Sequence, residues 1–299
     1  MEEYYDKKII GKGTYGKVYK CIDKDLNKVI SVKELDNEDV HFTTVRELKS
    51  LRMLRHKNIV ECYKIFHKES FHIVMEYVDY DLSVLIERKT IFSEMAIKTI
   101  IGQICSGLEY MHSLNLIHRD IKPGNILISE EGVVKIIDFG LTREISSTMT
   151  HKTCSLWYRA PELLLGKTNY DEKVDAWPLG CIIYEMITKK ILFSGNDELE
   201  QIHNVFNALG SPTVEYPLSN MIKLNRYNRD ESWVDIIGNY FRNLDASNDL
   251  IFLLGEFLNI NPKHRLSAKN YKFLNFLEGN ESLSIRPGII EVRNFGRKM

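Results

Sequence analysis

Three side chains that could together transfer a phosphoryl group lie in one short segment, HRDIKPGN, residues 118–125. Asp120 can accept the proton of an attacking hydroxyl, Lys122 can neutralise the moving phosphoryl group, and Asn125 can bind Mg²⁺. Asp138, in the tripeptide DFG, follows a predicted hairpin that brings it back beside Asn125. Two oxygen ligands suit Mg²⁺, which takes its other ligands from phosphates and water. One carboxylate alone is more often a turn cap, whereas the ordered set predicts phosphoryl transfer.

A glycine-rich segment near the N-terminus, GKGTYGKV, residues 11–18, has the spacing GxGxxGxV. Gly11, Gly13 and Gly16 allow the backbone to approach phosphates closely. A dinucleotide-binding fold shares this spacing but requires a helix directly after the third glycine. Here Val18 and the residues after it continue as a strand. The segment predicts a glycine-rich flap between two strands, with an ordinary hairpin turn as the alternative.

Glu47, in the segment HFTTVREL, residues 41–48, fits two roles. Thr44 followed three positions later by Glu47 is typical of a capping box, which begins a helix. Alternatively, Glu47 pairs with Lys33, which ends a predicted strand, and the lysine then binds nucleotide phosphates. One carboxylate cannot fully serve both roles. We therefore expect two positions for this helix: one in which Glu47 caps the helix's own first turn, and one in which Glu47 is turned toward Lys33. We also expect partner binding near residues 40–46 to select the second position.

The residues around these motifs predict the elements that position them. Runs of β-favouring residues predict strands over 4–10, 18–22, 29–33 and 71–78, and two short ones over 126–128 and 133–137. Apolar residues at helical spacing predict helices from residue 44, from a Ser93 cap to Met111, over 199–209 and over 249–258. The predicted fold class is α+β, with a β-rich N-terminal lobe containing one main helix and a mostly helical C-terminal lobe.

Composition excludes several classes of partner. The 299 residues include 40 basic and 41 acidic side chains, and the net charge of −1 predicts no nucleic-acid or membrane binding. The five cysteines lack the spacing of a zinc site or a disulfide framework. The N-terminus, MEEYYDKKII, does not resemble a signal peptide. We therefore expect an intracellular protein, cytoplasmic, nuclear or both.

Taken in order, these motifs resemble those of a eukaryotic protein kinase over about residues 4–275. They are GxGxxGxV, Lys33, Glu47, HRDIKPGN, DFG and APE at 160–162. KPGN after HRD is similar to serine/threonine kinases. GKGTYGKVYK, SLWYRAPELLLG (155–166), LFSGNDELEQI (192–202) and ALGSP (208–212) resemble the cyclin-dependent kinase family more closely. The resemblance implies the bilobal kinase fold, with an N-lobe at 1–76, a hinge at 77–82, a C-lobe at 83–285 and a tail at 286–299, the whole domain covering 4–285.

The resemblance implies transfer of the ATP γ-phosphate to serine or threonine of protein substrates, before proline because Arg159 marks the proline-directed group. The cofactors implied are ATP and Mg²⁺. The implied catalytic residues are Asp120, Lys122, Lys33, Glu47 and Ser155, and the metal ligands are Asn125 and Asp138. The implied nucleotide-binding residues are Ile10, Gly11, Gly13, Thr14, Tyr15, Gly16, Val18, Ser31, Lys33, Met75, Glu76, Tyr77, Val78, Asp81, Leu127 and Asp138. A pair between Glu162 and Arg265 and a bracing role for Asp175 are also implied.

Regulation is implied by the same resemblance. An upstream kinase would phosphorylate Thr150, with Thr148 and Thr153 as rivals, and Arg46, Arg119 and Arg143 would receive that phosphate. Inhibitory phosphorylation is implied at Thr14 and Tyr15. A cyclin or cyclin-like activator is implied near residues 40–55, although HFTTVRE keeps only the final Arg-Glu of the family's docking helix. The alternatives are a cyclin-independent proline-directed kinase and a pseudokinase that scaffolds partners.

Four positions depart from the family pattern. Ser31 replaces the usual alanine above the adenine, and Pro178 replaces a serine in DAWPLG, which is tolerable only in the first turn of a helix. Thr153 and Cys154 replace apolar residues near the pocket for the substrate proline. These last two replacements leave the strictness of proline selection open.

Overall fold

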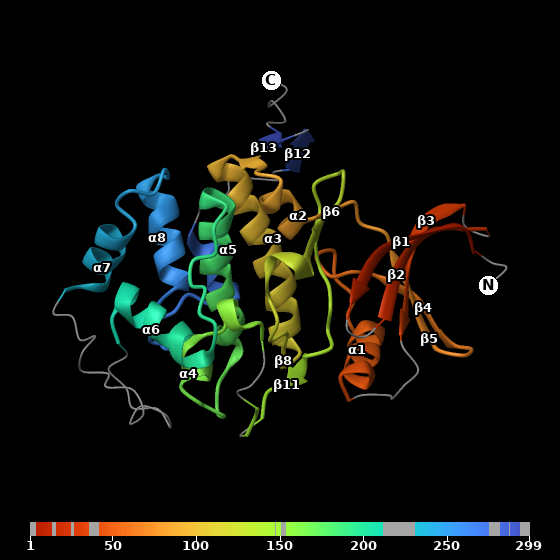
Figure 1. The fold of residues 1–299 in the computed structure, drawn as a ribbon, viewed down its shortest axis with the longest axis horizontal. Coiled ribbons are helices and arrows are strands. Elements are labelled where there is room, and N and C mark those ends of the chain that lie inside the picture. The colour runs from red at the N-terminus through yellow and green to blue at the C-terminus, as the bar shows by residue number, and fades with distance from the viewer. Residues whose placement is uncertain are drawn as a thin grey trace.

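The computed structural model describes residues 4–13, 16–24, 27–35, 42–146, 148–150, 154–211, 231–274, 282–286 and 288–293. Its N-terminal part is an antiparallel five-stranded sheet in the order β1-β2-β3-β5-β4, at the right of Figure 1. The strands are β1 (Tyr4–Gly13), β2 (Gly16–Asp23), β3 (Lys28–Leu35), β4 (Cys62–His67) and β5 (Phe71–Glu76). The strands predicted over 4–10, 18–22 and 29–33 are confirmed, and the one predicted over 71–78 ends two residues earlier. β4 was not predicted from the sequence; only its first residue is buried, and its residues do not alternate between buried and exposed.

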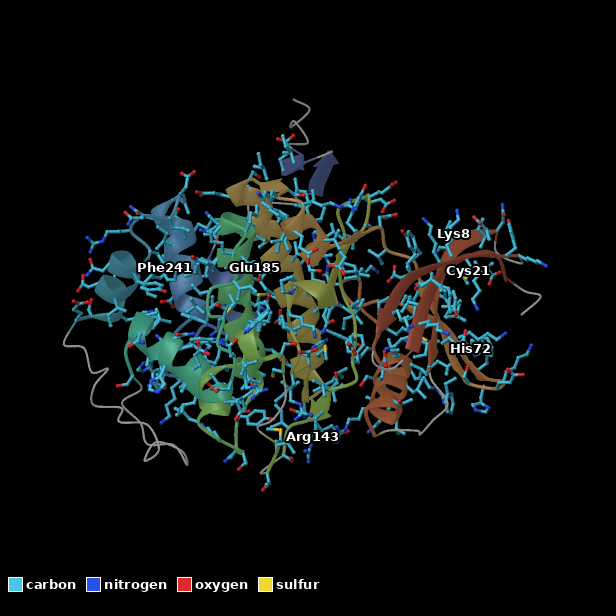
Figure 2. All side chains as sticks on the ribbon, viewed as in Figure 1. Lys8, Cys21, His72, Arg143, Glu185 and Phe241 are labelled. Atoms are coloured by element: carbon cyan, nitrogen blue, oxygen red, sulfur yellow. The ribbon has the colours of Figure 1, made fainter. Side chains whose placement is uncertain are left out.

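The sheet has a small core of its own. Cys21, Ile30, Val32 and Val74 are buried together on it, with Tyr63 and Phe66 packed against them. In Figure 2, Cys21 and His72 mark this sheet, whereas Glu185 and Phe241 lie in the helical part. The β-branched residues among these suit a pleated surface that is buried on one side.

Helix α1 (Phe42–Met53) lies beside this sheet. It buries Leu51 in the main core, and Leu48 packs against that core, as their helical spacing predicts. Thr44 is the third residue of α1, so the predicted capping box is wrong as the start of the helix. A capping residue has a non-helical backbone and precedes the first turn. The chain becomes helical two residues earlier, and the Glu47 carboxylate turns to another part of the molecule.

The remainder is mostly helical and forms the left of Figure 1. Its helices are α2 (Leu82–Glu87), α3 (Glu94–Ser113), α4 (Pro161–Leu164), α5 (Trp177–Thr188), α6 (Glu198–Leu209), α7 (Trp233–Tyr240) and α8 (Asn248–Phe257). The predicted cap of α3 is confirmed, since the Ser93 hydroxyl accepts from the Ala96 N–H at 3.1 Å. Pro178 lies in the first turn of α5, as predicted. No helix within the described ranges is long and apolar enough to cross a membrane.

A small sheet inside the helical part carries the loop that holds most of the polar motif residues. Strands β9 (Ile126–Ile128) and β10 (Val134–Ile136) form the predicted hairpin, and β6 (Tyr80–Asp81) pairs with β9. The Ile137 N–H donates to the Asn125 carbonyl at 3.0 Å. This bond brings Asp138 back beside Asn125, as the sequence predicts. Strands β8 (Leu116–Ile117) and β11 (Arg143–Glu144) pair just outside this loop.

The C-terminal region forms a hairpin that the sequence did not predict. Strands β12 (Ser282–Arg286) and β13 (Ile289–Arg293) are antiparallel, and β13 pairs in parallel with β7 (Ile91–Phe92). Leu283 and Ile290 are fully buried. Gly132, at φ +79° in the β9–β10 turn, lies so close to Leu283 that a Cβ there would be 2.6 Å from the leucine Cβ. The hairpin therefore covers the end of α3 and the β9–β10 turn.

Candidate active site

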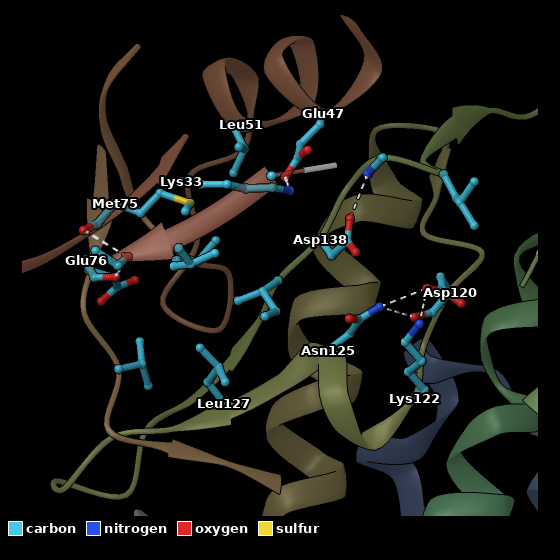
Figure 3. A pocket seen from close by; sticks show the side chains of 18 of the residues that line it. Lys33, Glu47, Leu51, Met75, Glu76, Asp120, Lys122, Asn125, Leu127 and Asp138 are labelled. Carbon is cyan, nitrogen blue, oxygen red and sulfur yellow. Dashed lines mark hydrogen bonds and ion pairs between the residues drawn. The ribbon is translucent and has the colours of Figure 1, made fainter. Parts of the chain in front are cut away.

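A cavity of about 560 Å³ lies between the sheet and the helical part. Figure 3 shows Met75, Glu76 and Leu127 at one end of it and Asp120 and Lys122 at the other. The predicted site residues that line the cavity are Ile10, Gly16, Val18, Ser31, Lys33, Glu47, Met75, Glu76, Tyr77, Val78, Asp120, Lys122, Asn125, Leu127, Asp138 and Ser155. Residues far apart in sequence therefore meet at one place.

Some predicted nucleotide-binding residues do not line this cavity. Gly11 and Gly13 lie in the β1–β2 hairpin, opposite Val18 and Gly16. The Asp81 carboxylate caps α2, accepting from the Ser83 N–H at 2.7 Å. Thr14 and Tyr15 lie outside the described residues. Conversely, Leu51, Val60, Ile137 and Leu141 line the cavity without having been singled out; for Leu51 the helical stripe of α1 was the available signal.

Lys33 and Glu47 form a partly buried ion pair across the cavity wall. The Lys33 Nζ lies 2.5 Å from Oε1 of Glu47, and the side chains are 17% and 7% exposed. Burial raises the pKa of Glu47, and the charge of Lys33 opposes this rise while the charge of Asp138 adds to it. The pair joins β3 to α1 (Figure 3). Glu47 is thus turned toward Lys33, the second of its two predicted positions.

The Asp120 carboxylate is held by four hydrogen bonds. Its Oδ1 accepts from the N–H and the hydroxyl of Ser155 at 2.9 and 3.0 Å. Its Oδ2 accepts from Lys122 Nζ at 2.8 Å and from Asn125 Nδ2 at 3.0 Å. Burial would raise the pKa of Asp120, but the hydrogen bond and charge of Lys122, with His118 and the Ser155 amide, outweigh burial and lower it. The group is therefore a carboxylate, able to accept a proton, throughout the neutral range.

The loop that carries Asp120 is braced from beneath by Asp175. This buried carboxylate accepts from the N–H groups of His118 and Arg119 at 2.9 and 2.8 Å. His112 Nε2 lies 2.9 Å from the same carboxylate. Burial would raise the pKa of Asp175, but these partners lower it. The bracing role that the sequence predicts for Asp175 is confirmed.

The donor set near Asn125 and Asp138 fits a hard divalent cation. Asn125 Nδ2 donates to the carbonyl and the carboxylate of Asp120, at 2.7 and 3.0 Å, which leaves its Oδ1 as the free ligand atom. Asp138 lines the same cavity in a left-handed backbone conformation, at φ +63°. Within the described residues no group of three or more His, Cys, Asp or Glu side chains could hold a metal alone. Two oxygen ligands of this kind suit Mg²⁺, which keeps water and phosphate oxygens as its other ligands.

Thr150 lies beside Arg119. Arg119 donates to the Thr150 hydroxyl at 3.5 Å and to the Tyr170 hydroxyl at 3.0 Å, and Tyr170 donates to the Thr150 carbonyl at 2.8 Å. Burial and the positive charges of Arg119 and Arg143 lower the pKa of Arg46. Thr150 and Thr148 are exposed, and Thr153 lies outside the described residues. Tyr170, which fixes the Thr150 backbone, was not anticipated.

Two further ion pairs hold the segment that follows Ser155. Arg159 contacts Glu198 of α6 at 2.5 Å and donates to the Cys154 carbonyl at 3.0 Å. Cys154 has a left-handed backbone, at φ +66°. The predicted pair between Glu162 and Arg265 is confirmed as a bidentate bond of 2.7 and 2.8 Å, fully buried. Arg159 therefore holds the Cys154 carbonyl, and Glu162 anchors α4 to the helical core.

Comparison with known proteins agrees with this fold and site. Residues 4–277 match the protein kinase domain, so the chain belongs to the protein kinase family. A probable cell division protein kinase of Encephalitozoon cuniculi is 38% identical over 289 residues, covering 95% of this chain and 93% of the relative. Cyclin-dependent kinase D-1 of Arabidopsis thaliana is 35% identical, over 90% of this chain and 69% of the relative. The solved yeast RNA polymerase II CTD kinase complex contains a chain with a TM-score of 0.80 and 32% identity, each chain being covered to 92%.

These relatives define the class of enzyme more narrowly. The chain is a serine/threonine protein kinase of the cyclin-dependent kinase type. The kinase domain implies ATP and a divalent metal as cofactors. The fold predicted from the sequence, a bilobal kinase fold of the α+β class, is confirmed.

Proposed function

We propose that this chain is an ATP- and Mg²⁺-dependent kinase that phosphorylates serine or threonine before proline in protein substrates, activated by a cyclin-like partner and by phosphorylation of Thr150. One observation carries the proposal. The hydrogen-bonded Asp120 carboxylate, the two oxygen ligands Asn125 and Asp138, and the Lys33–Glu47 pair all line a single cavity. Little covalent chemistry is required of the protein, since positioning and charge neutralisation supply most of the rate.

Each end of the cavity takes one part of the reaction. In this proposal the adenine binds between Val18 and Leu127 and against the segment from Met75 to Val78, all of which line the cavity, with the phosphates toward Lys33. Asn125 and Asp138 would hold the cation, which neutralises phosphate charge when bound. Asp120 orients the substrate hydroxyl and accepts its proton. The hydroxyl oxygen forms the new bond to the γ-phosphorus as the bond from that phosphorus to the β–γ bridging oxygen breaks, and ADP leaves.

Lys122 and Ser155 support this step by placing Asp120. Lys122 bonds both the Asp120 carboxylate and the Ser155 hydroxyl, the latter at 3.0 Å. Its ammonium lies beside the group that would accept the substrate proton, and from there it could neutralise negative charge that builds up on the transferring phosphoryl group. Glu47 fixes Lys33 so that the lysine points at the phosphates.

The geometry around Cys154 supports a preference for proline after the phosphorylated residue. The carbonyl of Cys154 accepts a hydrogen bond from Arg159 at 3.0 Å, with the backbone in a left-handed conformation, so this carbonyl already has a partner. A substrate residue at that point finds no acceptor there for its N–H, and leaving a polar group unpaired costs free energy. Proline has no N–H, so it loses no hydrogen bond when it occupies that position.

The test of this proposal compares the purified chain alone and with candidate cyclins on a Ser-Pro peptide and its Ser-Ala counterpart. We expect magnesium- and ATP-dependent phosphorylation that prefers Ser-Pro and rises when the right cyclin is added. Equal use of both peptides would overturn the proline preference, and Asp138→Asn with unchanged activity would overturn the metal assignment. The yeast relative is named as a complex, which supports a partner-bound active form.

Thr150→Ala is expected to lower the activity of the chain treated with an upstream activating kinase by about ten- to hundredfold. The phosphate would add nearly two negative charges beside Arg119, whose positive charge acts on Arg46, and would form charge-assisted bonds that order the segment around Thr150. Peptide phosphorylation before and after treatment measures the effect. Thr148→Ala is the matched control and should be activated normally; the reverse pattern would assign the phosphate to Thr148 instead.

A second candidate, a kinase active without a cyclin, is favoured by one contact. The Lys49 Nζ on α1 lies 3.0 Å from Oε1 of Glu144 on β11. The bridge ties α1 to β11, in the segment between DFG and APE, on the side of the helix away from the cavity. The chain's own residues therefore contribute to holding Glu47 at Lys33.

Lys49→Ala is expected to lower the partner-free activity by about two- to fivefold, because an exposed ion pair of this kind contributes up to about 1 kcal/mol. The loss should be largest at low salt, where screening is weakest. Peptide phosphorylation by the chain alone, at two ionic strengths, measures it. Arg52→Ala, on the exposed side of the same helix, is the control. Recovery in the charge-swapped double variant Lys49→Glu, Glu144→Lys would confirm the bridge, and no recovery would contradict it.

A further inference from the structure

Ser31 places a hydroxyl group at the base end of the cavity. It lies on β3, two residues before Lys33, so both side chains leave the strand on the same face. In the β3–β5 register Ser31 is opposite Met75. The side chain is 8% exposed and lines the cavity. The side chains nearest the proposed adenine position are otherwise mainly apolar, among them Val18, Val78 and Leu127, so this hydroxyl is a feature that the binding of ATP must accommodate.

The hydroxyl is bonded to the backbone that is proposed to recognise the base. Ser31 Oγ donates to the Glu76 carbonyl at 3.0 Å. The Met75 carbonyl lies 3.5 Å away, beyond the usual range of O–H···O bonds, so Glu76 is the principal acceptor. A serine hydroxyl has one proton that can rotate and two lone pairs. The same group can therefore donate to Glu76, or turn and donate to a ligand beside it.

We propose that Ser31 is a specificity-determining residue for the nucleotide base, and that its hydroxyl allows the site to accept 6-oxopurine triphosphates such as ITP and GTP as well as ATP. This inference rests on the proposed binding of a purine nucleotide in the cavity. The 6-amino group of adenine is a donor that suits the Glu76 carbonyl. A 6-oxo group is an acceptor and would face carbonyl oxygens. The rotated Ser31 hydroxyl supplies the donor that this oxygen needs.

Alanine at this position would supply no such donor. A 6-oxopurine would then meet the carbonyls of Met75 and Glu76 with its oxygen unpaired, while adenine would still donate its amino group. A ligand that leaves a buried polar group without a hydrogen-bond partner binds more weakly, so the site discriminates against that ligand. The hydroxyl of Ser31 therefore relaxes discrimination between the two classes of purine.

The experiment measures KM for magnesium ATP and magnesium ITP on a Ser-Pro peptide, for the wild-type chain with its activator and for variants at Ser31. ITP differs from ATP at the base's 6-position and at N1, and it lacks the 2-amino group of GTP. Ser31→Ala is expected to raise the ratio of KM for ITP to KM for ATP by about three- to tenfold. Ser31→Cys, of similar volume but a weak donor, should behave like alanine, and Ser31→Thr, which keeps the hydroxyl, should restore a ratio near that of the wild type.

Binding of the two nucleotides without peptide, followed by thermal shift, gives a second measurement that does not depend on turnover. Ser113→Ala is the matched control, since it removes a hydroxyl that donates to the Tyr110 carbonyl at 2.7 Å near the exposed end of α3. A KM ratio within about twofold of wild type in both Ser31→Ala and Ser31→Cys would overturn the inference while leaving the kinase function intact. Failure of the wild-type chain to use any purine triphosphate would instead overturn the proposed function.

Discussion

Asp120→Asn is expected to lower kcat by about 10²–10⁴-fold, the range found when a positioned acid–base group is removed. Asparagine keeps the shape of the side chain but cannot accept a proton from the substrate hydroxyl. Its amide would also face Lys122 and Asn125, which both donate to the Asp120 carboxylate. Steady-state phosphorylation of a Ser-Pro peptide by the activated complex measures the effect.

The control for this change must separate chemistry from folding and from nucleotide binding. Asp249→Asn alters an exposed carboxylate in the first turn of α8, far from the cavity, and should leave kcat unchanged. Thermal shift with magnesium ATP should still show nucleotide binding by Asp120→Asn, because the base and phosphate contacts remain. Full activity in Asp120→Asn would contradict the assigned role, whereas loss of ATP binding as well would mean that the substitution disrupts the loop itself.

The parts of the site that sequence predicted best are those fixed by short-range geometry. Asp120, Lys122 and Asn125 lie within six residues, and one short hairpin returns Asp138 to Asn125. Residues this close in sequence can be arranged in few ways, so the order of the motifs was enough to predict that these side chains lie together. The predicted helix start was wrong because it rested on sequence spacing alone. Thr44 and Glu47 have the spacing of a capping box, but the Glu47 side chain contacts Lys33 on another element instead.

Contacts between distant segments could not be predicted in the same way. The Lys49–Glu144 bridge joins residues 95 apart, and the Ser31–Glu76 bond joins residues 45 apart. The residue types do not indicate which residues will pair, because serine, lysine and glutamate are common at surfaces. Only the fold brings these pairs together. The β12–β13 hairpin is similar: its pairing with Ile91 and Phe92 depends on a short strand that has no pattern of its own.

Removing the positive partner of the buried Glu162–Arg265 pair is expected to have the largest effect on stability. Arg265→Met should lower the free energy of unfolding by about 3–5 kcal/mol, because it leaves the Glu162 charge buried without its partner. Arg265 also donates to the carbonyls of Asn259 and Lys173, at 2.9 and 3.1 Å, and those acceptors lose a donor too. Urea unfolding followed by tryptophan fluorescence measures the change.

The double variant Glu162→Gln, Arg265→Met shows how much of this loss comes from the unpaired charge. With the carboxylate gone, it should be less destabilised than the sum of the single variants, since the two residues are in direct contact. The exposed pair between Lys272 and Glu109, at 2.7 Å, is the matched control, and Lys272→Met should change stability by less than about 1 kcal/mol. Additive losses at Glu162 and Arg265 would contradict the pairing. Because α4 follows directly from Arg159, a weakened anchor at Glu162 should also loosen the hold on the Cys154 carbonyl, so the preference for Ser-Pro over Ser-Ala should decline in the single variants.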